Sequence, residues 1–208
     1  TPNLWDAGYA VFEGDRRGTK LWDAFEAANP GKTLLKASEI RTIMGQARAV
    51  RAPGHGLEGG GSPEQVIQWT DAATGIACKG MLDIVGDRGI IDLKGCGSIA
   101  EFERRAIRDG YAHQLAFYRR GLGGDLPCHL LAVETSVPHD VALLTLSPTL
   151  LDWADREISA LLARVAACEA SGVWPGRYPD GGALDLPAWL VEDEISGLED
   201  DEEVADVG

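Results

Sequence analysis

The chain has 208 residues and a formal net charge of −14, with 45% apolar and 25% charged residues. This is the composition of an ordinary globular protein, and the length suits one well-buried domain. No apolar run approaches the length that crosses a bilayer, and the opening residues TPNLWDAGYA lack the pattern of a secretory signal, so no membrane association is expected. The chain begins with Thr1 rather than Met, which is typical of a fragment.

The cysteines are widely spaced and form no CxxC pair. Such spacing argues against a zinc site and against a disulfide framework, and it is consistent with a reducing cytoplasm. The cysteines are therefore expected to be packing residues in a cytoplasmic protein. They are Cys78, Cys96, Cys128 and Cys168.

The negative charge is concentrated at the C-terminal end. Residues 191–208 contain nine Asp and Glu residues and neither Lys nor Arg, so the other 190 residues carry only −5 of the −14. We expect one domain over residues 1–190, followed by an acidic, disordered tail over 191–208. Because the tail holds most of the charge, the acidic balance does not exclude a polyanionic partner such as DNA.

The predicted elements indicate helices on a central sheet. In chain order they are a short extended piece before residue 20, helices at about 20–28 and 38–50, and strands at about 65–70, 76–85 and 89–94. A helical region at about 98–122 with a candidate break at Gly110 follows, then strands at about 129–136 and 139–146, and a helix of about 22 residues that opens at Ser147-Pro148. Ser38 is the expected N-cap of the second helix. This order predicts an α/β or α+β fold, with a mixed sheet of about five strands flanked by helices.

The stretch GMLDIVGDRGIIDLKG, residues 80–95, reads as a β-hairpin around Gly86-Asp87-Arg88-Gly89. A two-residue loop would pair Gly86 with Gly89 and, three residues further along each strand, Asp83 with Asp92. Side chains alternate between the faces of a strand, so apolar and charged residues would separate. The expected apolar face holds Leu82, Ile84, Ile91 and Leu93, and the expected polar face holds Asp83, Asp92 and Lys94.

Two like charges opposite each other destabilise a hairpin. A bound cation would compensate Asp83 and Asp92, and carboxylates with backbone carbonyls suit Mg²⁺ or Mn²⁺. The alternative is a solvent-facing hairpin with scattered charges.

The helical region that follows carries Tyr111, Gln114 and Tyr118 on one face, because they are spaced i, i+3 and i+7. A buried face seldom has Gln at its middle. Five arginines lie in the same region, namely Arg104, Arg105, Arg108, Arg119 and Arg120. An amphipathic surface helix is the alternative interpretation.

The combination of a strand Asp, a turn, a strand Asp-x-Lys and a helix with Gln-x-x-x-Tyr resembles the PD-(D/E)XK nuclease superfamily. Within it, the chain is most similar to the RecE/exonuclease VIII family of phage and prophage recombination exonucleases. IIDLK at 90–94 and QLAFY at 114–118 are the sharpest parts of the resemblance. It also covers YAVFEGDRRGTKLWDAFEAANPGKT, DAATGIACKGMLD, VETSVP and WPGRY.

The resemblance implies a restriction-endonuclease-like core and a role for each matching residue. Asp83, Asp92 and the Leu93 carbonyl would bind Mg²⁺, with Mn²⁺ as a substitute, and Glu64 would be a further ligand. Lys94 would orient the attacking water or stabilise the phosphate in the transition state. Gln114 and Tyr118 would line the site and touch the nucleic-acid backbone.

The chain departs from the family pattern at three places. Met81 and Leu82 stand where the family often has Arg and Pro, and Gly95 and Cys96 follow the lysine where Thr is common. The N-terminal helix of the family, which bears a histidine, would lie upstream of Thr1. These departures concern substrate contacts and leave Asp83, Asp92 and Lys94 in place.

The function that the resemblance implies is a metal-dependent exonuclease that degrades double-stranded DNA ends 5′→3′ and leaves 3′ single strands for recombination. Implied partners are DNA ends, a single-strand annealing protein and further copies of the chain, in the cytoplasm of a bacterium or a phage-infected host. The alternatives are a nuclease of another PD-(D/E)XK type, a catalytically silent DNA-binding or assembly module, and an interaction protein without a DNA role.

Overall fold

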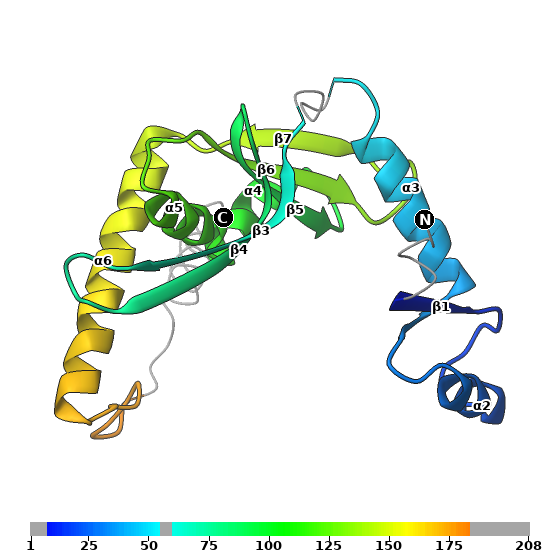
Figure 1. Ribbon diagram of the computed structural model, residues 1–208, viewed down its shortest axis with the longest axis horizontal. Helices are drawn as coiled ribbons and strands as arrows, with labels where there is room; N and C mark the ends of the chain where they lie inside the picture. The colour runs from blue at the N-terminus through cyan, green and yellow to red at the C-terminus, as the bar shows by residue number, and fades with distance from the viewer. Residues whose placement is uncertain (1–7, 55–59, 184–208) are drawn as a thin grey trace, which may run out of the picture. The chain divides into compact units, whose positions relative to one another are not determined.

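The computed structural model describes residues 8–54 and 60–183, so the acidic tail at 191–208 lies outside the described residues (Figure 1). The chain divides into two compact units, residues 1–167 and residues 168–208, and the first contains both sheets and all the residues of the candidate site. The end of the domain at residue 190 therefore stays a prediction. No helix in the described ranges has both the length and the apolar character needed to span a membrane.

The elements follow the predicted order, with one addition near the start. In chain order they are β1 (Tyr9–Phe12), α2 (Lys20–Ala28), β2 (Thr33–Lys36), α3 (Ala37–Val50), β3 (Ser62–Thr70), β4 (Ala77–Gly86), β5 (Gly89–Cys96), α4 (Phe102–Arg108), α5 (Tyr111–Leu122), β6 (Cys128–Glu134), β7 (Val141–Thr145) and α6 (Pro148–Ser171). The addition is a small parallel sheet in which β1 pairs with β2 around the connecting helix α2. The sequence had indicated only a short extended piece there.

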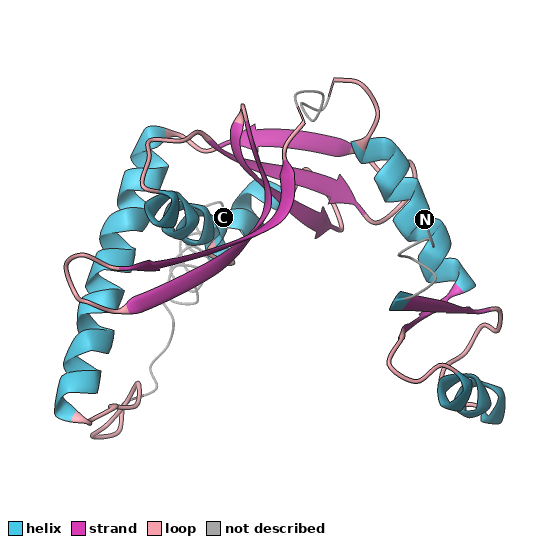
Figure 2. Cartoon of the chain, in the orientation of Figure 1, coloured by secondary structure: helices cyan, strands magenta, loops and turns pink. Residues whose placement is uncertain are grey.

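The main sheet has five strands in the order β3-β4-β5-β6-β7. Figure 2 colours the strands magenta and the helices cyan. Only β5 and β6 run parallel, and the other neighbouring pairs are antiparallel. The predicted mixed sheet flanked by helices is therefore confirmed. Strand β6 is buried along almost its whole length, and its sequence CHLLAVE is accordingly mostly apolar rather than alternating.

Helices α4, α5 and α6 cover the sheet with one continuous apolar core. Phe102 of α4, Leu115 of α5 and Leu151 of α6 belong to the same buried cluster as Ile90 of β5 and Leu130 of β6. Burial of such side chains contributes about 1.5–3 kcal/mol each. This core fixes α5 over β5, which carries the residues of greatest chemical interest.

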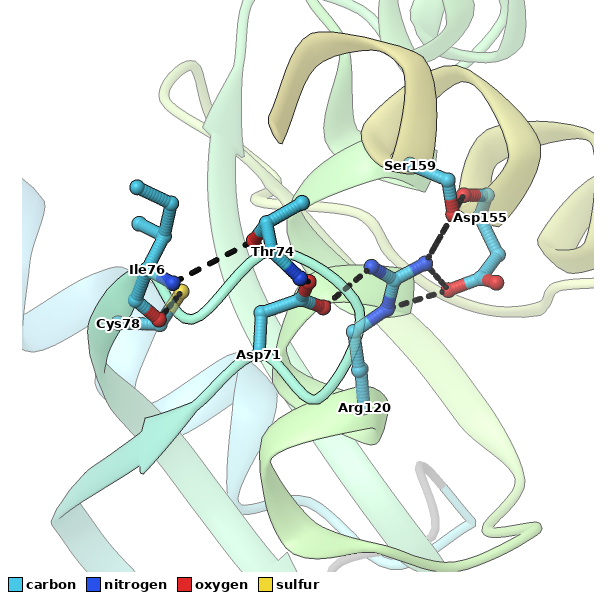
Figure 3. A network of polar contacts seen from close by, with 7 residues as sticks. All are labelled: Asp71, Thr74, Ile76, Cys78, Arg120, Asp155 and Ser159. Carbon is cyan, nitrogen blue, oxygen red and sulfur yellow. Dashed lines mark hydrogen bonds and ion pairs between the residues drawn. The ribbon is translucent and has the colours of Figure 1, made fainter. Parts of the chain in front are cut away.

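A polar network fixes the far end of α5 (Figure 3). Arg120 donates from Nη1 to Asp71 Oδ1 (3.1 Å), from Nε to Asp155 Oδ1 (2.9 Å) and from Nη2 to Ser159 Oγ (2.7 Å). Thr74 Oγ1 donates to the other Asp71 oxygen (2.7 Å), and this hydrogen bond is the main cause that lowers the pKa of Asp71, against the effect of its burial. The β3–β4 turn, α5 and α6 are thereby joined around one guanidinium group.

The predicted N-cap Ser38 is wrong. Helix α3 follows β2 without a break and begins at Ala37, with Lys36 as its N-cap. The Lys36 N–H donates to the carboxylate of Glu39 (2.8 Å), as in a capping box. Because β2 had not been recognised in the sequence, the start of α3 was placed too late.

Candidate active site

The predicted hairpin register is correct near the turn and wrong at the two aspartates. Gly86 pairs with Gly89, and the next two pairs also match, but the ladder ends before Asp83. Instead of facing Asp92, Asp83 accepts a hydrogen bond from the Leu93 N–H at its Oδ2 (2.8 Å). The side-chain carboxylate takes the place of a backbone acceptor, so strand pairing stops where the charged residues begin.

The predicted division into an apolar and a polar face is also partly wrong. Asp92 is only 1% exposed, on the face that α5 covers, and Leu82 is buried in that same core. Leu93, expected on an apolar face, is 43% exposed. The reason is that β5 is a central strand, with Ile91 also buried, so burial does not alternate along it as in a two-stranded hairpin.

The buried Asp92 carboxylate is contacted at both oxygens. Lys94 forms an ion pair with Oδ2, and Gln114 donates from Nε2 to Oδ1 (3.0 Å). The same Gln114 nitrogen donates to the Tyr118 hydroxyl (3.0 Å), so both protons of the amide are used. The structure thus brings Asp92, Lys94, Gln114 and Tyr118 into one connected group, with two members from β5 and two from α5.

Tyr111, which the sequence places on the same helix face as Gln114 and Tyr118 as a weaker member of the site, belongs to this group as well. The Lys94 ammonium lies 4.8 Å from the centroid of the Tyr111 ring, which is within the range of a cation–π contact. The tyrosine stands three residues before Gln114, one turn earlier on the same face of α5. That spacing is a signal in the sequence, but its partner Lys94 becomes visible only in the fold.

Glu64 has an unusual backbone but does not join the two aspartates. Its φ is 49°, in the left-handed region that non-glycine residues rarely adopt, and its side chain is exposed. The ladder of β3 and β4 pairs Pro63 with Ile84 and Gln65 with Leu82, and it omits Glu64 and Asp83 between them. Over residues 8–54 and 60–183, no three His, Cys, Asp or Glu side chains gather closely enough to hold a metal ion.

The electrostatics of Asp92 favour a nearby cation. Burial raises the pKa of Asp92, the ion pair with Lys94 opposes this, and the charge of Asp83 raises it further. In the described part of the chain, Asp92 Oδ2 has no hydrogen bond of good geometry, although Lys94 lies against it. A buried carboxylate with a second carboxylate close by has the donor chemistry that a hard divalent cation prefers.

The sequence profile of a family described as a PDDEXK-like domain of unknown function (DUF3799) matches residues 23–183. The chain belongs to this family. The superfamily resemblance read from the sequence is therefore confirmed, while the closer placement with RecE stays a prediction. A search of curated protein sequences finds no match.

Two solved structures are similar to this PDDEXK-like chain. One is described as a "putative exonuclease" from Eubacterium rectale, with a TM-score of 0.59 and 20% identity over 83% of this chain and 73% of that one. The other is an alkaline exonuclease (LHK-Exo) from Laribacter hongkongensis, with a TM-score of 0.38 and 18% identity over 73% of this chain and 83% of that one. The first similarity supports the restriction-endonuclease-like fold.

Proposed function

We propose that the chain is a metal-dependent DNA nuclease whose active site is the group around Asp92. The observation that carries this proposal is the buried Asp92 carboxylate, held between Lys94 and Gln114 where the β4–β5 ladder ends at Asp83. A buried anion of this kind costs folding stability. Membership of the PDDEXK-like family supplies the reaction class, which is hydrolysis of a phosphodiester bond.

PDDEXK nucleases generally use divalent metals, and the proposed ligands here are Asp83, Asp92 and the Leu93 carbonyl, with Glu64 as an outer ligand. Mg²⁺ is the proposed ion and Mn²⁺ its substitute. When bound, such an ion neutralises charge on the phosphate and lowers the pKa of a coordinated water. Asp83 and Asp92 are suited to hold it because both are on strands of the main sheet, which fix their positions.

The remaining side chains act on the phosphate or on one another. Lys94 presents its ammonium to the charge that develops on the phosphate, and Tyr111 limits the positions that this ammonium can take. Gln114 fixes the orientation of the Asp92 carboxylate, and the Tyr118 hydroxyl in turn fixes the Gln114 amide. Tyr118 is also proposed to touch the nucleic-acid backbone.

The proposed specificity is that of an exonuclease on double-stranded DNA ends. The resemblance to RecE supports digestion in the 5′→3′ direction, leaving 3′ single strands for recombination. A single-strand annealing protein and further copies of the chain are proposed partners on the same grounds.

Direction and end preference are tested with linear duplexes labelled at either the 5′ or the 3′ end, together with a covalently closed circle. We expect early release of the 5′ label as mononucleotide, late release of the 3′ label, and an intact circle. Early release of the 3′ label would contradict the direction, and cleavage of the circle would indicate an endonuclease.

A catalytically silent DNA-binding module is the second candidate. The observation that favours it is that Glu64 does not gather with Asp83 and Asp92, so the described residues offer no ready three-carboxylate site. This candidate predicts DNA binding without cleavage at any concentration of Mg²⁺ or Mn²⁺.

Gly80 of β4 is expected to position Tyr118. A Cβ atom at residue 80 would lie 2.7 Å from Cε1 and 2.8 Å from Cδ1 of the Tyr118 ring, closer than real contacts allow. We therefore expect Gly80→Ala to displace the ring, break its hydrogen bond with Gln114, and lower the cleavage rate by about ten- to a hundredfold. The rate is measured on linear duplex DNA.

Gly97→Ala is the matched control for this substitution. A Cβ at residue 97 meets nothing within 4 Å, and the residue has no left-handed backbone. This variant should cleave at the wild-type rate. Equal rates for Gly80→Ala and Gly97→Ala would remove Tyr118 from the proposed site.

A further inference from the structure

Helix α3 has a basic face that takes no part in the proposed chemistry. Arg41, Met44, Arg48 and Arg51 follow one another at i, i+3, i+7 and i+10, so they lie along one side of the helix. All four are exposed, and Met44 is 58% exposed. We call these four residues the arginine stripe.

The arginine stripe has no acidic residue beside it in the sequence. From residue 40 to residue 57 the sequence contains no Asp or Glu, in a chain with a net charge of −14. Glu39, which precedes the stripe, is held by Arg17 (2.8 Å) and by the Lys36 N–H. Within the described ranges, no ion pair is formed by any arginine of the stripe.

Several other arginines in the described ranges have acidic partners. Arg105 and Arg108 of α4 both pair with Asp109 (3.0 Å each), and Arg120 pairs with Asp71 and Asp155. In the stripe, by contrast, Arg48 and Arg51 stand three residues apart and repel each other. A polyanion on this surface would offset that repulsion.

The opposite side of α3 anchors the helix near the proposed active site. Gln46 Nε2 donates to the Glu134 carbonyl (3.3 Å), and Gly45 lies so close to the His139 ring that a Cβ atom at residue 45 would collide with it. Glu134 ends β6 and is the register partner of Cys96 in β5, two residues beyond Lys94. The stripe therefore belongs to a helix fixed at the same end of β5 as the catalytic lysine.

We propose that the arginine stripe of α3 binds the phosphate backbone of the DNA substrate and so holds the duplex at the active site. This proposal rests on the proposed nuclease function and names a surface for its substrate. Guanidinium groups suit phosphate because they donate paired hydrogen bonds. A surface hollow of about 460 Å³, lined by Met44, Ala47, Arg48, Arg51 and Ala52, lies along the stripe.

The apolar content of the stripe argues against the other polyanionic partner, a membrane of acidic lipids. A helix that binds in the membrane interface buries a broad apolar face beside its basic residues. Here Met44 is the single large apolar residue of the stripe. Phosphate contacts without an apolar anchor fit nucleic acid.

The test measures binding of a short linear duplex by the full chain without divalent metal, across a series of KCl concentrations. In the variant Arg41→Ala/Arg48→Ala/Arg51→Ala, affinity should fall about tenfold or more at low salt. The slope of log Kd against log salt should decrease by about 0.9 for each phosphate that the variant no longer neutralises. The Lys variant at the same three positions keeps the charge and should retain most of the slope.

Arg156→Ala/Arg164→Ala, which removes two exposed arginines of α6, is the matched control and should leave the slope unchanged. Equal losses in this control and in the stripe variant would overturn the proposal, because only net charge would then matter. The proposal would also be overturned if the stripe variant lost more affinity for vesicles of acidic lipid than for DNA.

Cleavage kinetics separate this proposal from the proposed function. With metal, the stripe variant should show a raised KM and a nearly unchanged kcat. If the wild type never cleaves DNA but binds it through the stripe, the role of the stripe in DNA binding is supported and the nuclease function is refuted. If the stripe variant cleaves DNA with the same KM as the wild type, the role of the stripe in DNA binding is refuted and the nuclease function is not.

Discussion

Asp92→Asn should abolish metal-dependent DNA cleavage and, at the same time, make the metal-free protein more stable than the wild type. Cleavage is lost because the amide cannot replace a charged metal ligand. Stability rises because burial is the main influence on Asp92 and disfavours its charged form, more than Lys94 favours it. A neutral side chain of the same shape avoids that cost.

The stability difference should depend on pH in a defined direction. The pKa of Asp92 is raised in the folded protein, so its contribution to stability is present at acidic pH and lost as the pH rises above the ordinary value of 3.8 through the raised pKa. The Asp92→Asn variant has no carboxyl group to ionise at this position, so its stability does not fall in this way as the pH rises. The gain in melting temperature over the wild type should therefore grow from acidic to neutral pH, as measured by thermal unfolding in EDTA.

Added metal should reverse the order of stability. Mg²⁺ or Mn²⁺ stabilises only a chain that binds it, by about 2.7 kcal/mol at a hundred times Kd. We expect a metal-dependent rise in melting temperature for the wild type and none for Asp92→Asn. Asp87→Asn, in the exposed turn of the same hairpin, is the control and should behave as the wild type. A metal response that survives in Asp92→Asn would exclude Asp92 as a ligand.

Lys94→Met should lower the cleavage rate by about 10²–10³-fold, the usual effect of removing one group that stabilises charge in a transition state. Unlike Asp92→Asn, it should also destabilise the fold. The methionine fills the space of the lysine stem but leaves the buried Asp92 without its counter-charge, and breaking such a pair on one side costs about 3–5 kcal/mol. Denaturant unfolding in EDTA near neutral pH measures this loss.

The double variant Asp92→Asn/Lys94→Met separates the two contributions. With both charges removed, most of the stability lost in Lys94→Met should return, because no uncompensated anion remains. Additive stability changes would show that the two side chains do not interact. Cleavage should be absent from the double variant, as from Asp92→Asn alone.

Much of the fold follows from local sequence patterns. The bounds of α2, the hairpin around Gly86 and Gly89, and the order of strands and helices all rest on turn residues and periodicity, which act over a few residues. The small parallel sheet was missed because β1 and β2 are four residues long each and are separated by α2. Short strands of this kind are defined by their partner more than by their own sequence.

The candidate site was predicted in composition but not in geometry. Residue spacing sufficed to bring Gln114 and Tyr118 to one face of α5, and the fold sets that face over Asp92. Alternation along a strand could not reveal that the Asp83 side chain replaces a backbone acceptor and ends the ladder. Nor could it reveal the left-handed backbone of Glu64 or the closeness of Gly80 to Tyr118, because both depend on neighbouring strands.

The most direct test of the central proposal compares the wild type with Asp92→Asn on linear duplex DNA, with Mg²⁺ and with EDTA. We predict progressive conversion of the duplex to single strands and mononucleotides by the wild type with Mg²⁺, and an intact duplex in the other three reactions. Equal digestion by both proteins with Mg²⁺, or digestion by the wild type in EDTA, would contradict the assignment of Asp92 to a metal-dependent nuclease site.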